Sequence, residues 1–340
     1  TCCQAGFGKS GARFIVSTIF AVNMIGWFGI QNGVCGEAFS NAMLAMTGWD
    51  IPVVVSNTIW GIIMLLTAVY GVHALEKLDK ISIPLLMIIM CYGTFLAFKV
   101  YGTGNLNDEG TVQSMSFMSG VALSFNFTAV GTITGPDYTR FQKSRKDTVK
   151  SVFYGVFPMG VITLIMGIVL TKLSGQYDIS MVLIEVGLPL LGIIALVIST
   201  WTTNSTNAYS AGLNIVMALK LKDNRRREAT LISGIVGIVL CDLGILGHVE
   251  GVLSLLSYVV CPVGGVILAD YWVVGKGKAK NFRPQDGVNW AGVIAWALGA
   301  IISYTLVKIE FVGIIIGFVI YLIAERFIPS ASRDNAENIA

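Results

Sequence analysis

The strongest constraint on this chain is a series of ten apolar segments, each of roughly the length that crosses a bilayer. They lie at about 14–36, 51–72, 81–102, 112–134, 149–173, 181–218, 229–247, 250–273, 288–307 and 310–327. Only 13% of the residues are charged, whereas a soluble domain carries about 25%. The sequence therefore predicts an all-α polytopic membrane protein with short loops and no soluble domain.

Lys and Arg are distributed unevenly among the loops. With the start of the chain in the cytoplasm, the cytoplasmic loops hold 20 of the 23 Lys and Arg residues. The outer side holds only Lys99, Lys172 and Lys308. The positive-inside rule then places both ends of this chain in the cytoplasm. We expect a multi-pass protein of the plasma (inner) membrane, in contact with lipid.

The sixth segment is too long for one simple span, and Pro189 is expected to mark an entry or kink near its start. It carries a polar stripe on one helical face, formed by Ser199, Thr202, Thr203, Thr206, Asn207 and Ser210. Such a stripe is costly in lipid unless it faces protein or water. Hydroxyl and carbonyl oxygens suit Na⁺, and Ser199, Thr202 and Thr203 are the candidates. The alternative is that these hydroxyls bond to carbonyls of their own helix.

The first segment places Asn23, Trp27 and Gln31 on one helical face. An indole stacks on flat heteroaromatic rings, and a carboxamide bonds to their edges. In the fourth segment we expect Asn126 and Phe127 near mid-membrane, with Phe127 as a second stacking surface opposite Trp27. The alternatives are that these aromatic rings pack the core and that the amides bridge helices.

Several classes of function have no support in the sequence. There is no Ser-His-Asp set, Cys-His pair or phosphate-binding loop, so we expect neither an enzyme nor an ATP-driven pump. The net charge of +3 gives no support to nucleic-acid binding. We expect no organic cofactor, and the only metal ion with candidate ligands is Na⁺ as the coupling ion. A channel remains an alternative class, although the polar groups gather at one depth instead of lining a continuous pore.

Four motifs in order resemble the nucleobase–cation symporter-1 family, and within it the bacterial cytosine/purine permeases. They are GWFG at 26–29, GPDYTRF at 135–141, WTTNSTNAYSAGL at 201–213 and CPVGGVILADYW at 261–272. The resemblance implies twelve helices, of which the first ten form a five-plus-five inverted repeat. The ten segments would then be helices three to twelve, with two helices missing before Thr1. Residues 1–273 would form the transport core, and 274–340 two further helices and a tail.

The resemblance also implies roles for individual residues. Trp27 matches a stacking tryptophan, Phe127 its aromatic counterpart, and Gln31 a substrate-binding glutamine. Asn126 is a polar neighbour of Phe127, and Ser199, Thr202 and Thr203 fall on sodium positions. Asn23 and Asn207 complete the expected substrate residues. Two departures concern Met24 and Ser199, where cytosine permeases have a glutamine and an asparagine.

The expected function is a secondary active symporter that imports a nucleobase, cytosine-like or purine-like, with Na⁺ or H⁺. The alternative substrates are other small heterocycles, namely a hydroxymethylpyrimidine, allantoin or a hydantoin.

Overall fold

The computed structural model describes residues 2–107, 116–139, 142–176, 178–282 and 284–328, and all regular structure in them is helical. The α-helices are α1 (Gln4–Gly11), α2 (Ser17–Thr47), α3 (Val53–Tyr70), α4 (Val72–Tyr101), α5 (Phe117–Thr139), α6 (Arg145–Lys150), α7 (Phe157–Ser174), α8 (Ile179–Glu185), α9 (Pro189–Ala218), α10 (Arg226–Asp242), α11 (Val249–Leu268), α12 (Trp290–Ile302) and α13 (Val312–Phe327). Shorter π or 3₁₀ turns are η1 (Ala12–Val16), η2 (Gly104–Asn107), η3 (Ser151–Val156), η4 (Asp223–Arg225), η5 (Ile245–His248), η6 (Ala269–Val274), η7 (Ala279–Asn281) and η8 (Ser303–Val307).

Each of the ten predicted spans corresponds to a long helix, which confirms the all-α membrane fold. The first residues of the span predicted at 112–134 and the tail beyond 328 lie outside the described residues. By length and composition, seven helices among the described residues can cross a membrane. The other three predicted spans fall on α9, which carries the polar stripe, and on α10 and α13, which have 17 and 16 residues. Those two lengths are at the lower limit for a span.

The long sixth segment is broken where the sequence predicts. The short helix α8 ends at Glu185 and α9 begins at Pro189. Proline is favoured at the first position of a helix, because the missing N–H has no intrahelical partner there. Gly187 in the connection has φ +87°, a backbone conformation that suits glycine. Therefore α9 is a separate element of 30 residues.

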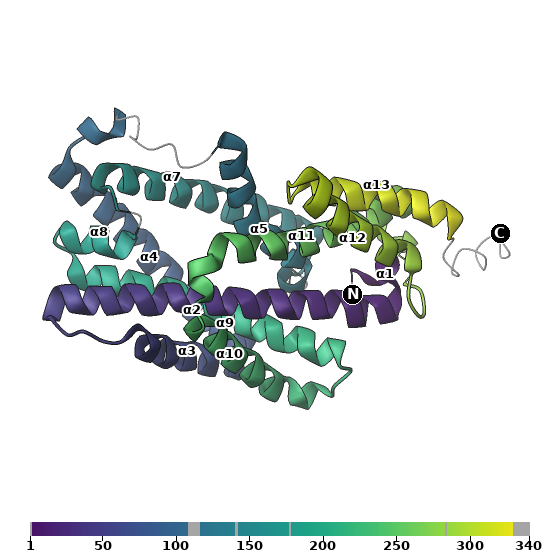
Figure 1. Cartoon of the computed structure of the whole chain (residues 1–340), viewed down its shortest axis with the longest axis horizontal. Coiled ribbons are helices and arrows are strands. Elements are labelled where there is room, and N and C mark those ends of the chain that lie inside the picture. The colour runs from purple at the N-terminus through teal and green to yellow at the C-terminus, as the bar shows by residue number, and fades with distance from the viewer. Residues whose placement is uncertain (1, 108–115, 140–141, 177, 283, 329–340) are drawn as a thin grey trace.

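The long helix α2 is the centre of the molecule. It packs against α9, α3 and α10 on one side, and Figure 1 shows these four helices lying together. Small residues allow close approach, as is usual between membrane helices. A Cβ added to Gly212 of α9 would lie 2.0 Å from Thr230 Oγ1 of α10. The backbones of α9 and α10 are therefore in close contact at Gly212 and Thr230.

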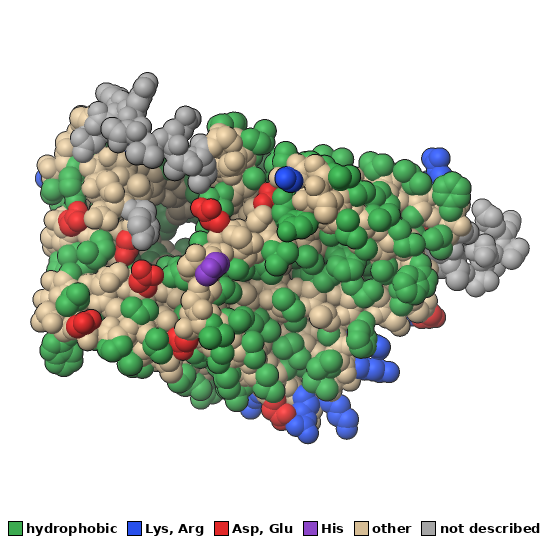
Figure 2. All heavy atoms as spheres, in the orientation of Figure 1, with side chains coloured by type: hydrophobic (Ala, Val, Ile, Leu, Met, Phe, Trp, Pro, Cys, Tyr) green, Lys and Arg blue, Asp and Glu red, His purple; other side chains and the backbone are tan. Residues whose placement is uncertain are grey.

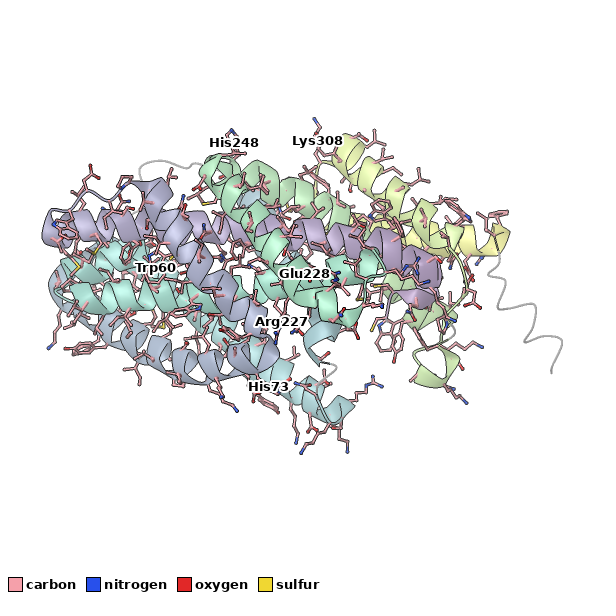
Figure 3. All side chains as sticks on the ribbon, turned by 90° about the horizontal axis from the view of Figure 1, so that it is seen from below. Trp60, His73, Arg227, Glu228, His248 and Lys308 are labelled. Carbon is pink, nitrogen blue, oxygen red and sulfur yellow. The ribbon has the colours of Figure 1, made fainter. Side chains whose placement is uncertain are left out.

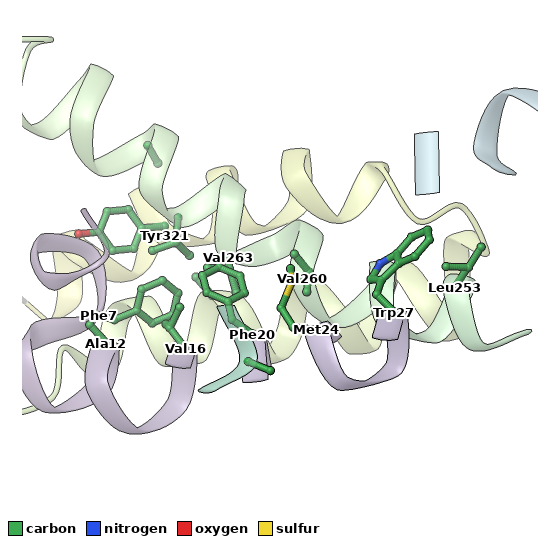
Figure 4. Close-up of a cluster of buried hydrophobic side chains, with 14 of the residues drawn as sticks. Phe7, Ala12, Val16, Phe20, Met24, Trp27, Leu253, Val260, Val263 and Tyr321 are labelled. Atoms are coloured by element: carbon green, nitrogen blue, oxygen red, sulfur yellow. The ribbon is translucent and has the colours of Figure 1, made fainter. Parts of the chain in front are cut away.

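The C-terminal helices form a second group. α11, α12 and α13 pack on one another, and α5 packs on α11 (Figure 1). A buried apolar cluster joins this group to α2. Figure 4 shows Met24 and Trp27 of α2 next to Val260 and Leu253 of α11.

Charged side chains are unevenly placed on the surface. In the view of Figure 2, Lys and Arg gather at the lower right, where α9 connects to α10. Asp and Glu surround a hollow at the left of the same view. This separation agrees with the positive-inside pattern, while the sidedness of the chain remains a prediction.

Candidate functional site

The structure brings the two predicted stacking residues into contact. The ring centroids of Trp27 and Phe127 lie 5.7 Å apart, with 57° between the ring planes. Trp27 is 8% exposed, because it belongs to the cluster between α2 and α11, whereas Phe127 is 54% exposed. A flat ring held between two others needs them about 7 Å apart. The pair is therefore closed, and Phe127, the exposed partner, has to move before a ligand can stack on Trp27.

Two buried amides accompany this pair. Asn23 is one turn before Trp27 and 1% exposed, and its Nδ2 donates to the Leu256 carbonyl of α11 over 3.4 Å. Asn126 precedes Phe127 and is 3% exposed. The Oδ1 atoms of Asn23 and Asn126 have no donor among the described residues. An unsatisfied buried oxygen costs about 1–3 kcal/mol, so both amides are suited to accept a ligand N–H.

Gln31 lies one turn beyond Trp27 and lines a cavity of about 950 Å³. Ser199 of the polar stripe lines the same cavity. The carboxylate residues Glu37 and Asp178 are in the lining too, and no Lys or Arg of the described part of the chain is. The predicted substrate residue Gln31 and the predicted ion residue Ser199 thus line the same cavity, and its two carboxylates favour a cation.

The three predicted ion residues have hydrogen bonds within their own helix. Ser199 Oγ donates to the Leu196 carbonyl over 3.0 Å. Thr202 and Thr203 both donate to the Ser199 carbonyl, over 3.0 and 3.1 Å. This is the alternative that the sequence left open, but it does not exclude an ion. A hydroxyl that donates its proton keeps oxygen lone pairs for a cation.

The remainder of the stripe is less uniform. Thr206 Oγ1 donates to the Thr202 carbonyl, and Asn207 Nδ2 approaches Asn204 Oδ1 at 3.4 Å. Ser210 is buried. The stripe thus changes from exposed at Ser199 and Thr203 to half-buried and then buried toward the C-terminal end of α9.

The sequence left open whether Asn204 faces the substrate or a neighbouring helix, and it gave no role to Ser205; both lie on the opposite face of α9. Asn204 Nδ2 donates to the Phe28 carbonyl over 3.2 Å, and Ser205 Oγ donates to the Met64 carbonyl over 3.0 Å. These bonds attach α9 to α2 and α3. Sequence reasoning missed Ser257 of α11, one of two serines in an apolar run, which is 1% exposed and whose Oγ has no partner among the described residues.

Other reactive residues lie away from this region. His73 and His248 are exposed and lie on opposite edges of the molecule in Figure 3. Among the described residues, no group of three or more His, Cys, Asp or Glu side chains is placed to hold a metal ion. Glu185 at the end of α8 accepts a bond from the Tyr101 hydroxyl over 2.6 Å. We therefore assign these groups no part in the site.

The chain matches, over residues 2–325, the family described as permease for cytosine/purines, uracil, thiamine, allantoin. It is 31% identical over 317 residues to cytosine permease of Escherichia coli (strain K12), covering 92% of this chain and 72% of that protein. It is 25% identical over 383 residues to allantoin permease of Bacillus subtilis (strain 168), covering 97% and 77%.

The fold agrees with a solved structure. A nucleobase-cation-symport-1 family transporter, in a closed conformation with bromovinylhydantoin bound, superposes with a TM-score of 0.74 at 20% identity. The match covers 96% of this chain and 78% of that one. The chain is thus a multi-pass integral membrane protein with a transporter fold, and it belongs to the family of permeases for cytosine/purines, uracil, thiamine and allantoin.

Proposed function

We propose that this chain is a secondary active symporter that imports a cytosine-like or purine-like nucleobase with Na⁺ or H⁺. The observation that carries the proposal is the contact between Trp27 and Phe127 beside two buried amides, Asn23 and Asn126. An aromatic pair provides stacking for any flat heterocycle. Buried amide oxygens without donors add acceptors for its N–H groups.

Binding begins with a separation of the aromatic pair. The exposed ring of Phe127 turns away from Trp27, and the heterocycle enters between them. Its edge bonds to Asn23 and Asn126, while Gln31 faces the adjoining cavity. When the substrate ring lies between Trp27 and Phe127, it contacts both side chains and so fixes the position of α5 relative to α2. Substrate therefore biases an equilibrium between two arrangements of these helices, as alternating access requires.

The coupling ion binds at the N-terminal part of the stripe, where Ser199 and Thr203 are exposed and Thr202 is half-buried. Ser199, Thr202 and Thr203 offer hydroxyl oxygens there, and Ser199 lines the cavity that also holds Glu37 and Asp178. Na⁺ prefers such oxygen ligands. Asn207 lies farther along the same helix, and its Nδ2 bonds to Asn204. We assign Asn207 to the edge of the substrate site.

A related heterocycle is the second candidate substrate. The similarity to an allantoin permease and to a transporter solved with bromovinylhydantoin supports it. Hydantoins, allantoin and pyrimidines share a flat ring with N–H groups at its edge, so one site chemistry serves all of them. Competition between these compounds and labelled cytosine ranks the candidates.

The first test removes the indole. In cells that express the protein from its complete gene, Trp27→Ala should abolish saturable uptake of the heterocycle, because one stacking surface is lost. The control is Trp60→Ala, since Trp60 contacts Phe39 instead, with 5.2 Å between the ring centroids. Uptake that stays unchanged in Trp27→Ala at equal expression contradicts the stacking site. Ion conductance without saturation would favour a channel.

A further inference from the structure

Ser257 differs from most serines of a membrane helix. Such serines usually bond to a carbonyl of the preceding turn. Ser233 does so, donating to the Thr230 carbonyl over 2.9 Å, and Ser303 donates to the Gly299 carbonyl over 2.7 Å. Ser257 is equally buried, but its Oγ has no partner among the described residues. A hydroxyl in this position is available to a ligand.

The face of α11 that carries Ser257 is directed at the stacking tryptophan. Leu253 precedes Ser257 by four residues and Val260 follows it by three, so the three side chains share one helical face. Leu253 and Val260 pack in the same cluster as Trp27, as Figure 4 shows. The adjoining Leu256 carbonyl accepts the bond from Asn23. Ser257 therefore lies at the depth of Asn23 and Trp27.

The same serine is level with Asn126. A Cβ on Gly264 of α11 would lie 3.1 Å from Ile133 Cδ1 of α5. Ser257 precedes Gly264 by seven residues and Asn126 precedes Ile133 by seven, which is about two helical turns in each case.

Both helices contact the same segment, Glu310 and Phe311 before α13, at that height. Phe125 contacts Phe311 with ring centroids 5.6 Å apart, and Ser254 donates to Glu310, the residue before Phe311. The order of contacts is thus the same along α5 and α11, from Phe125 and Ser254 to Ile133 and Gly264. This order places Asn126 and Ser257 at a similar height on two helices that pack on each other.

We infer that Ser257 is a third polar contact of the substrate, and that it reads the N–H pattern of a flat heterocycle. This inference rests on the proposed function. Asn23, Asn126 and Ser257 supply one buried oxygen each from α2, α5 and α11. Two amide oxygens accept from N–H donors, and a hydroxyl both donates and accepts. The set suits a heterocycle with an amino group beside a ring nitrogen, and occupancy ties the three helices together.

The test is equilibrium binding of labelled cytosine to the purified protein. Ser257→Ala should weaken binding about tenfold, as expected for one lost hydrogen bond in a buried site. Ser257→Thr keeps a hydroxyl and should restore binding. Competition with uracil and N4-methylcytosine, which alter the amino group, should discriminate less in Ser257→Ala than in the unaltered protein. A merely structural serine would not change this ranking.

The matched control is Ser233→Ala, a buried serine that bonds within its own helix. Its affinity and its competitor ranking should equal those of the unaltered protein. Equal affinity and ranking in Ser257→Ala would overturn the inference while leaving the proposed function standing. Should Ser257→Ala fail to fold, Ser257→Cys, nearly equal in volume, has to show the same loss. Absence of saturable binding in the unaltered protein overturns the proposed function and this inference together.

Discussion

The two faces of α9 carry the same kinds of side chain in opposite situations. On one face, Asn204 and Ser205 are fully buried and bond to backbone carbonyls of α2 and α3. On the other, Ser199 and Thr203 are exposed and bond only to their own helix. Residue type is therefore no guide to role in this helix. What differs is the neighbour: the first face meets protein backbone, and at Ser199 the second meets a cavity.

The comparison separates stability from function. Interhelical hydrogen bonds in membranes are worth about 0.6 kcal/mol on average and at most about 2 kcal/mol. Asn204 and Ser205 on the packed face form such interhelical hydrogen bonds. Groups on the open face donate only within their own helix, so their oxygen lone pairs stay available to an ion. We therefore expect changes on the packed face to lower stability, and changes on the open face to alter ion dependence alone.

The largest effect should follow from Gly212→Val, at the contact between α9 and α10. A Cβ there would meet Thr230 backbone atoms at 2.7 Å, so the two helices have to separate. Overpacking costs about 1–3 kcal/mol, and more where backbone is displaced. We expect little monodisperse protein and a lower Tm. Gly167→Val on α7 is the control, because no atom lies within 4 Å of its Cβ position. A normal Tm in Gly212→Val would contradict the close contact.

A smaller effect is expected for Asn204→Ala on the packed face. It removes the bond from Nδ2 to the Phe28 carbonyl and leaves a small cavity. The loss should be about 1–2 kcal/mol of unfolding free energy, measured as a reduced Tm in detergent. Thr206→Ala serves for comparison, since its hydroxyl bonds to Thr202 of the same helix. If both variants lose the same stability, the two faces do not differ as described.

The smallest effect on stability is expected for Thr203→Ala on the open face. Its hydroxyl makes a local bond and the side chain is exposed, so Tm should not change. The Na⁺ concentration for half-maximal uptake should instead rise about tenfold, as for one lost charge-assisted contact. Ser205→Ala, on the packed face, should leave the Na⁺ dependence unaltered. An unchanged Na⁺ dependence in Thr203→Ala would remove it from the ion site.

Much of the fold could be predicted from the sequence, because lipid imposes simple rules. Apolar length locates the helices, and Pro189 marks the break before α9. The spacing of four residues predicts that Asn23 and Trp27 share one helical face, because the helical repeat alone determines which residues share a face. The likeness of four motifs to one family of transporters indicates the global arrangement from the sequence alone.

The rest depends on contacts between distant segments. Asn204 and Ser205 bond to neighbouring helices, whereas Thr203 bonds within α9. No local sequence pattern predicts this difference. Ser257 shares an apolar run with Ser254, and nothing in the run distinguishes the two, so its alignment with Asn23 and Asn126 follows only from the packing of α11 on α2 and α5. The contact between Trp27 and Phe127 likewise depends on the tertiary packing of α2 and α5.

The most direct test of the central claim is equilibrium binding of labelled cytosine to the purified protein, with and without Na⁺ and over a series of pH values. The account predicts saturable binding that unlabelled heterocycles displace and that Na⁺ or added protons tighten. It also predicts that Trp27→Ala removes this binding. Binding of neither cytosine nor any competing heterocycle, or saturable binding indifferent to both Na⁺ and pH, would contradict a cation-coupled heterocycle transporter.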